Sequence, residues 1–215
     1  MDRRIPLMRE ENGPRKRRLR SRNMIGKDVY GKLRSAHGRH ASWAVWAEPG
    51  ERPKSNTSDL SVFDDPRLLD ILNDKYVFVG LNVSQEGQYR DWSNFHSPLP
   101  SQNDYKLRYA FRGTVFWGSY LTDLFKDVPE AQSGKVREAL RKGEIDIDEH
   151  IRVLEEELGV LGHPVVIAFG NLVYDCLSDN LTSFRVVRLR HYSDYCSKER
   201  YQEEVLDLER EISLN

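Results

Sequence analysis

Short apolar runs alternate with amphipathic segments along most of the chain. Four runs are rich in Val, Ile, Leu and Phe and have the length of buried strands. They are residues 76–82, 120–125, 164–169 and 184–190. The segments between them have helical spacing, so the order predicts an α/β fold with three layers. In this α/β/α arrangement, helices cover both faces of a central four-stranded parallel sheet.

The helices are predicted from apolar positions that recur every three or four residues. The clearest stripe follows Asp146-x-x-Glu149, a sequence typical of a capping box. Its members are Ile147, Ile151, Leu154, Leu158 and Leu161. In the segment 198–213, the expected inward residues are Tyr201, Val205, Leu208 and Ile212. Further helices are expected from Pro66 through Leu72 and at 104–112, 133–142 and 172–180, and residues 28–37 are expected to form a short helix or a turn.

Two segments have a weaker pattern. Residues 41–47, which include two tryptophans, allow a strand, and residues 49–58 have the Pro, Gly, Ser and Asn content of a loop. Residues 84–104 are expected to form a long polar loop between a strand and a helix.

Length and charge set the domain organisation. A chain of 215 residues with 39% hydrophobic residues can bury one full core, which predicts a single α/β domain over residues 41–215. Residues 1–40 form a basic arm and a short helix: residues 1–22 contain nine Arg or Lys and three acidic residues. Such an arm suits a polyanion, and a solvated tail or leader is an equal alternative.

Cysteine content and hydropathy indicate the compartment. Cys176 and Cys196 are too few for a disulfide framework and lack metal-ligand spacing, so no metal site is expected. No apolar run reaches the ~18 residues that cross a bilayer, and the first residues lack the apolar region of a signal peptide. We therefore expect a cytoplasmic protein without membrane contact.

Candidate chemistry lies where two of the predicted strands end. Asn82 closes the first strand and His191 follows the last. Because parallel strands in open α/β sheets bind ligands beyond their carboxyl ends, these two side chains are expected to share one pocket.

An ordered set of motifs resembles the uracil-DNA glycosylase superfamily over about residues 70–213, in the style of the branches that begin with Gly-x-Asn-Pro-Gly. The set consists of Gly80-Leu81-Asn82, Phe95, Thr122-Asp123, the strand-glycine-helix unit Val165 to Gly170, and His191-x-Ser193. The resemblance implies hydrolysis of the N-glycosidic bond of a damaged or deaminated base that has been flipped out of the DNA. It implies DNA as the partner, and it leaves strand preference and oligomeric state open. No cofactor is expected, because the two cysteines cannot form the set that holds the iron-sulfur cluster of some branches of the superfamily.

The resemblance also assigns roles to residues. Asn82 would orient the attacking water, and His191 would stabilise the departing base. The residues expected to bind the base are Gly80, Leu81, Ser84, Phe95 and Asp123, and those expected to contact DNA are Arg190, Tyr192 and Ser193. For Asn82, Phe95 and His191 the alternatives are a turn cap, a hydrophobic plug and an ordinary surface histidine. His96, with Asn94, is the alternative polar contributor from the long loop.

Three departures bear on activity. Val83-Ser84 replaces Pro-Gly in the first motif, and Tyr192 stands where many relatives have Pro. Asp123 stands where the superfamily often has an amide. An ionised carboxylate only accepts hydrogen bonds, so it would disfavour uracil and favour an exocyclic amine. This holds unless Thr122 or a backbone group reads the base instead, or Asp123 is protonated or caps a helix. A catalytically inactive nucleic-acid- or nucleotide-binding protein of the same fold is therefore the alternative function.

Overall fold

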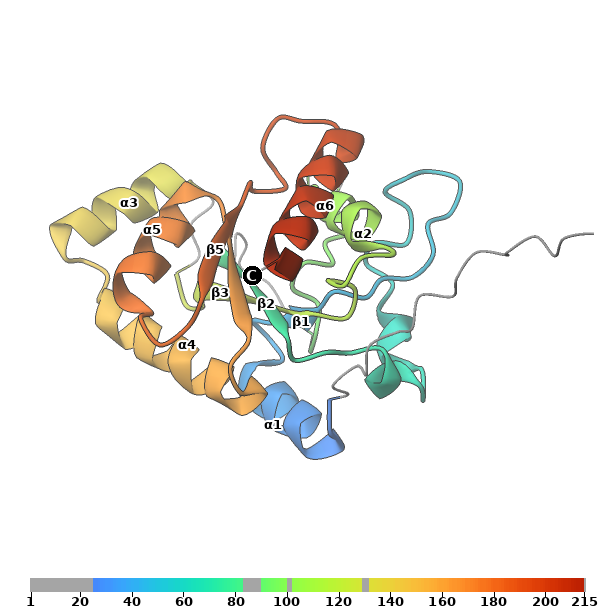
Figure 1. Cartoon of the computed structure of the whole chain (residues 1–215), viewed down its shortest axis with the longest axis horizontal. Coiled ribbons are helices and arrows are strands. Elements are labelled where there is room, and N and C mark those ends of the chain that lie inside the picture. The colour runs from blue at the N-terminus through green and yellow to red at the C-terminus, as the bar shows by residue number, and fades with distance from the viewer. Residues whose placement is uncertain (1–24, 83–89, 100–101, 129–131, 215) are drawn as a thin grey trace, which may run out of the picture.

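The computed structural model describes residues 25–82, 90–99, 102–128 and 132–214. Its centre is a five-stranded mixed sheet in the order β1-β3-β2-β4-β5 (Figure 1). The parallel strands are β2 (Tyr76–Asn82), β3 (Tyr120–Phe125), β4 (Val165–Phe169) and β5 (Val186–Leu189). The edge strand β1 (Ser42–Trp43) pairs antiparallel with β3. The predicted α/β class is confirmed.

The predicted four-stranded, wholly parallel sheet is wrong at its edge, where β1 adds a fifth strand of opposite direction. This strand has only two residues, so it is too short to show alternation in the sequence. Backbone bonds between Ala44 and the turn before β3 prolong the pairing, with Ala44 N donating to Ser119 O and Gly118 N donating to Ala44 O.

Helices cover both faces of the sheet, as Figure 1 shows. They are α1 (Lys27–His37), α2 (Asp104–Phe111), α3 (Ser133–Lys142), α4 (Ile147–Leu161), α5 (Asn171–Asn180) and α6 (Lys198–Leu214). Neighbouring residues on a strand point to opposite faces. Accordingly, Val77 and Val79 pack with residues of α1, α4 and α5, whereas Phe78 packs with residues of α2 and α6.

Local sequence signals account for most of these elements. The Asp146 side chain accepts hydrogen bonds from the backbone N–H groups of Asp148 and Glu149, which is the expected cap of α4. All four expected inward residues of α6 are buried. Helix α1 packs against α4 and buries Leu33 completely, so residues 27–37 share the core of the following domain. The basic arm, residues 1–22, lies outside the described residues.

The helix predicted from Pro66 through Leu72 is wrong. The chain instead forms two 3₁₀ turns, Leu60–Asp64 and Leu68–Asp70. Bonds between residues three apart hold this region, including Leu68 N to Asp65 O and Ile71 N to Leu68 O. Only Ser42 and Trp43 of the possible strand at 41–47 adopt strand structure.

Candidate functional site

A cavity of about 550 Å³ lies at the carboxyl edge of the parallel strands. It combines the end of β2, a residue of β3, the segments that follow β4 and β5, and part of the 90–99 loop. The residues predicted from the sequence that line it are Gly80, Leu81, Asn82, Phe95, Asp123, His191, Tyr192 and Ser193. The expected convergence of Asn82, Phe95, Asp123 and His191 is therefore present, while their chemical roles stay predictions.

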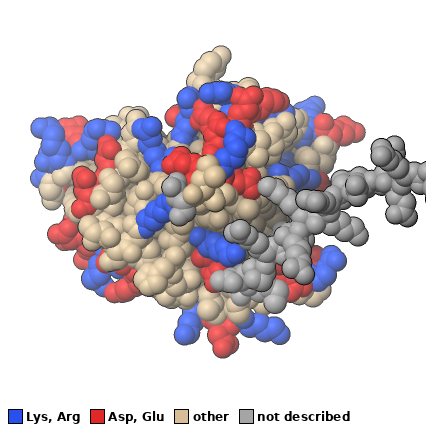
Figure 2. All heavy atoms as spheres, in the orientation of Figure 1, with Lys and Arg blue, Asp and Glu red and all other residues tan. Residues whose placement is uncertain are grey.

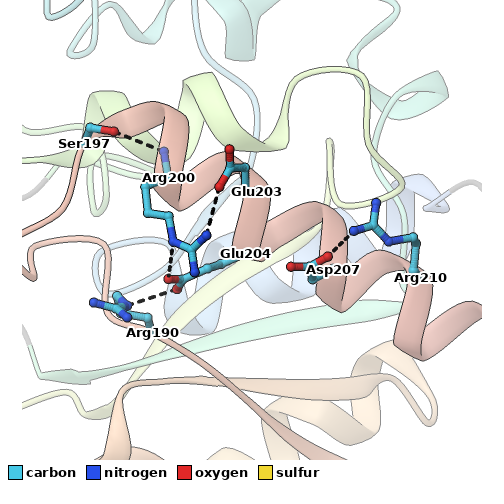
Figure 3. Close-up of polar contacts among 7 residues, drawn as sticks. All are labelled: Arg190, Ser197, Arg200, Glu203, Glu204, Asp207 and Arg210. Carbon is cyan, nitrogen blue, oxygen red and sulfur yellow. Dashed lines mark hydrogen bonds and ion pairs between the residues drawn. The ribbon is translucent and has the colours of Figure 1, made fainter.

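Two predicted residues are not found in the described part of this lining. Ser84 lies outside the described residues. Arg190, the expected DNA contact, lines a different hollow and is turned toward α6, where its Nε lies 3.0 Å from Glu204 Oε2. Figure 3 shows Glu204 between Arg190 and Arg200, so the charge of Arg190 is already compensated.

Gly80 makes room for the Asp123 carboxylate, which forms the polar floor of the cavity. It lies opposite Asp123 in the register of β2 and β3. A Cβ atom on Gly80 would lie 2.2 Å from Asp123 Oδ1 and 3.3 Å from Phe95 Cζ, so only glycine allows both side chains to approach. The contribution of Gly80 to the site is therefore the space that its missing side chain leaves for Asp123 and Phe95.

Asp123 is buried, at 3% exposure, and its carboxylate is held by the 90–99 loop. Asn94 Nδ2 donates to Asp123 Oδ2 at 2.8 Å and also to His40 O. Burial raises the pKa of Asp123 to about 6, and the bond from Asn94 partly opposes that shift. The group does not cap a helix, and above pH 6 it is mainly a carboxylate.

Thr122 does not replace Asp123 in the cavity. Its hydroxyl donates to Glu157 Oε1, which is on the opposite side of the strand. Lys126 bridges the two sides, because its Nζ donates to the main-chain oxygen of Asp123 at 2.8 Å and lies 2.8 Å from Glu157 Oε2. The Lys126 ammonium group therefore forms an ion pair with Glu157 and a hydrogen bond with the backbone.

Phe95 forms an aromatic wall in a fixed loop. Its backbone has a φ of 61°, in the left-handed region that non-glycine residues rarely adopt. Asn94 Oδ1 accepts from Phe95 N, and Trp46 Nε1 donates to Phe95 O, so both backbone groups are bonded. The residue is 6% exposed, and its ring packs against Phe169 and Tyr192. Phe95 is therefore a hydrophobic plug that also lines the cavity.

His96 does not contribute to the cavity. It is 2% exposed, stacks on Trp46, and bonds Val45 O through Nε2. Burial lowers the pKa of its ring. The alternative that His96 supplies polar chemistry is therefore wrong, and Asn94 is the contributor from this loop.

The hydrogen bonds of His191 define its tautomer. Its Nδ1 accepts from the backbone N–H of Ser193 at 3.1 Å, and the Ser193 hydroxyl lies 2.6 Å from the same atom. A backbone N–H can only donate, so the neutral ring carries its proton on Nε2. Burial lowers the pKa of His191, which keeps the ring neutral near pH 7. The ring therefore has an N–H donor available for a ligand.

Tyr192 supports the histidine. Its ring stacks on His191 with centroids 4.6 Å apart, and its phenol hydrogen bonds the buried carboxyl group of Asp104. Tyr192 is 9% exposed, which does not fit the expected DNA-contacting role, because a phenol held by a buried carboxyl group cannot reach a phosphate. Its ring lines the cavity instead.

Asn82 and the start of α5 complete the site. Asn82 Nδ2 donates to Val128 O at 2.6 Å, which fixes the amide at the end of β2. Gly170, with a φ of 84°, turns the chain into α5, whose first residues line the cavity together with Arg137. Helix N-termini present backbone N–H groups and favour anions. This end of the cavity suits a negatively charged group.

Sequence reasoning missed several lining residues, notably Gln102, Ser133 and Arg137. Gln102 follows a proline-rich stretch and Arg137 is an exposed position of α3, so neither has a local signal of function. Asn171 could have been found, because a strand followed by glycine and a helix places the helix start beside a site.

No protein-family model, curated protein or solved structure matches the chain. In the part of the chain that the structure describes, no three His, Cys, Asp or Glu side chains are grouped to hold a metal ion. None of the described helices is both long and apolar enough to cross a membrane. Functional assignment rests on the geometry of the cavity.

Proposed function

We propose that the protein hydrolyses the N-glycosidic bond of a damaged or deaminated nucleobase in DNA. The observation that carries the proposal is the pairing, across one cavity, of an aromatic wall and carboxylate with a neutral histidine. The Nε2 proton of this histidine has no hydrogen-bond partner among the described residues. Adjacent strands lie ~4.8 Å apart, so the backbones of β3 and β5 are separated by about 14 Å.

Each residue of the cavity has a separate role in the proposed reaction. A flipped base stacks on Phe95 and presents its polar edge to Asp123. As the bond breaks, negative charge accumulates on the base, and a hydrogen bond from His191 Nε2 stabilises it. Asn82, fixed by its bond to Val128, orients water toward the cationic sugar. The start of α5 and Arg137 attract the adjoining phosphate.

The size of the cavity and its position at the carboxyl edge of parallel strands support this assignment. A volume of about 550 Å³ lies within the usual range of small-ligand sites. Asn82 and Asp123 lie in parallel strands, His191 follows a parallel strand, and Phe95 joins them from the 90–99 loop. The resemblance of those motifs to the uracil-DNA glycosylase superfamily supports the reaction type, whereas the five-stranded mixed sheet supports only the α/β class.

Binding without hydrolysis is the second candidate. It is favoured by the candidate water-orienting group, because the Asn82 amide is neutral and its Nδ2 is engaged with the Val128 carbonyl. An amide can align water but is a weak proton acceptor. A protein that recognises a nucleotide without cleaving it would need the same aromatic wall and polar floor.

A panel of oligonucleotides tests the proposed reaction. Each carries one modified or deaminated base, in single and double strands, and abasic sites are detected by alkaline strand cleavage. We expect release of at least one base by the full chain and none by His191→Ala. Tight binding of an oligonucleotide with no base released from any member would support the second candidate instead.

A further inference from the structure

Among the described residues, Asn94 is the one side chain that donates a hydrogen bond to the carboxylate of Asp123, so part of its acceptor capacity is unused. Asn94 occupies one of roughly four acceptor positions of the two oxygens. In the described ranges no lysine or arginine pairs with this carboxylate, because Lys126 contacts Glu157 and the main-chain oxygen of Asp123. A buried anion that forms no ion pair is stabilised by further hydrogen-bond donors, and a ligand in the cavity can supply them.

Nucleobases differ in the donors that they offer on the Watson-Crick edge. Uracil and thymine have one N–H between two carbonyl oxygens, and both oxygens would face the carboxylate unfavourably. Adenine and cytosine have an amino group beside an unprotonated ring nitrogen. Guanine alone among these bases has two adjacent donors, N1–H and the N2 amino group. Two parallel N–H groups match the two oxygens of a carboxylate, as in other bidentate pairs.

We infer that this cavity selects a guanine-type base, whose N1–H and N2 amino group donate to Asp123 while Phe95 stacks on the ring. The inference rests on the proposed binding of a base in the cavity and names its class. Lesions of guanine that leave N1 and N2 unchanged, such as those at N7 or C8, keep the recognised edge. Uracil, the base suggested by the motif resemblance, lacks it.

The rigid surroundings of Asp123 make the selection strict. Its Oδ1 packs over Gly80, its Oδ2 is held by Asn94, and Asn94 is itself bonded to His40 and Phe95. The carboxylate therefore cannot turn away from an acceptor without breaking these contacts. An oxygen or unprotonated ring nitrogen of a wrong base would face a fixed negative charge.

The test compares bases that differ by single groups. Fluorescence anisotropy measures the affinity of the full chain for labelled thymine oligonucleotides that carry one central guanine, hypoxanthine or uracil nucleotide. A 2′-fluorine on that nucleotide prevents hydrolysis. Hypoxanthine is guanine without its amino group, so we expect it to bind about 5- to 100-fold more weakly. Asp123→Asn should reduce this difference to less than about twofold and favour uracil.

Asp127→Asn is the matched control, because the same change occurs at an exposed position outside the cavity. It should retain the wild-type preference. Equal wild-type affinity for guanine and hypoxanthine, or tighter binding of uracil, would overturn the inference even if Asp123→Asn did not fold. A preference for guanine without release of any base would contradict the proposed hydrolysis but not the inferred selectivity. Release of uracil without a preference for guanine would contradict the selectivity but not the hydrolysis.

Discussion

At the scale of single residues, burial acts on two ionisable groups that face one cavity. It raises the pKa of Asp123 to about 6 and lowers that of His191, so both shifts favour the neutral forms. Near pH 7 the outcome still differs between them: Asp123 remains mainly an anion and His191 remains neutral. One group accepts hydrogen bonds and the other donates one, which is the division of roles that the proposed base recognition and release require.

His191→Ala should lower the single-turnover rate of base release by about 10²- to 10³-fold, the usual loss when one preorganised donor is removed. Ser193→Ala is the matched control. It removes a hydroxyl but keeps the backbone N–H that fixes the tautomer of His191, so we expect a much smaller loss. Similar losses for both variants would contradict the role given to the Nε2 proton. Circular dichroism checks that both variants fold.

Asp123→Asn should change how stability depends on pH. The pKa of Asp123 is higher in the folded protein than the ordinary value of 3.8, so the folded state binds this proton more tightly. The carboxylate therefore destabilises the fold above pH 6, and this cost disappears as the pH falls toward 4. Urea unfolding at several pH values should show wild type gaining up to about 3 kcal/mol relative to the variant over that range. Parallel stability profiles would mean that Asp123 is not buried in solution.

The site residues at strand ends could be predicted from the sequence, but the residues that form hydrogen bonds with the site residues could not. Asn82 and His191 follow recognisable strands, so their approach to one edge follows from chain direction alone. Asn94 gives no such signal, because it lies in an irregular loop where Trp92 and Phe95 have positive φ. Its bond to Asp123 spans 29 residues and depends on the folded loop. The burial of Tyr192 likewise depends on Asp104, which lies far away in sequence.

At the scale of elements, the site depends on the contact between β2 and β3. Gly80 and Asp123 lie side by side in the parallel register, and the Asp123 side chain extends across the glycine. Because the spacing between the two strands is fixed, they cannot move apart to fit a larger residue at position 80. The polar floor of the cavity is thus built into the sheet rather than into a surface loop.

Gly80→Ala should disrupt this floor. The added methyl group would meet Asp123 Oδ1 at 2.2 Å, so we expect a loss of roughly 1 to 3 kcal/mol in stability and loss of base binding. Gly159→Ala is the comparison: it lies within α4 with nothing within 4 Å of the added atom, and it should stabilise by about 0.5 to 1 kcal/mol. Urea titrations measure both. An equally stable Gly80→Ala that still bound a base would contradict the described packing.

Periodicity found the longer elements and failed for the shortest. Strands β2 to β5 and helices α1 to α6 have enough residues to display their repeat, and all were predicted within a few residues. Strand β1 has two residues, and its pairing is set by the turn before β3. The 3₁₀ turns near Pro66 have the composition of a helix start, but their hydrogen bonds close after three residues instead of four.

At the scale of the whole molecule, charge is distributed unevenly along the sequence. Residues 1–22 are strongly basic, whereas the complete chain has a formal net charge of -1. On the face shown in Figure 2, positive and negative side chains are interspersed. Broad attraction to DNA is therefore expected from the arm more than from this face, and the cavity is expected to provide selectivity.

Deletion of residues 1–22 should weaken binding to undamaged duplex DNA and reduce its salt dependence. Each phosphate contact that is lost removes roughly 0.9 from the slope of log affinity against log salt. Anisotropy titrations between low and moderate salt measure this slope for the full and shortened chains. An unchanged slope would show that the arm is a solvated tail. Base selectivity should be the same in both chains, because we assign it to Asp123 and Phe95, which the shortened chain keeps.

The position of a bound base tests the central claim most directly. A crystal structure of the full chain with an oligonucleotide whose central 2′-fluoro nucleotide resists hydrolysis would reveal it. We expect the base between Phe95, Asp123 and His191, with His191 Nε2 within hydrogen-bonding distance of the base and the adjoining phosphate near the start of α5. A base that remained stacked in the DNA, or that bound elsewhere while this cavity contained only water, would contradict the account.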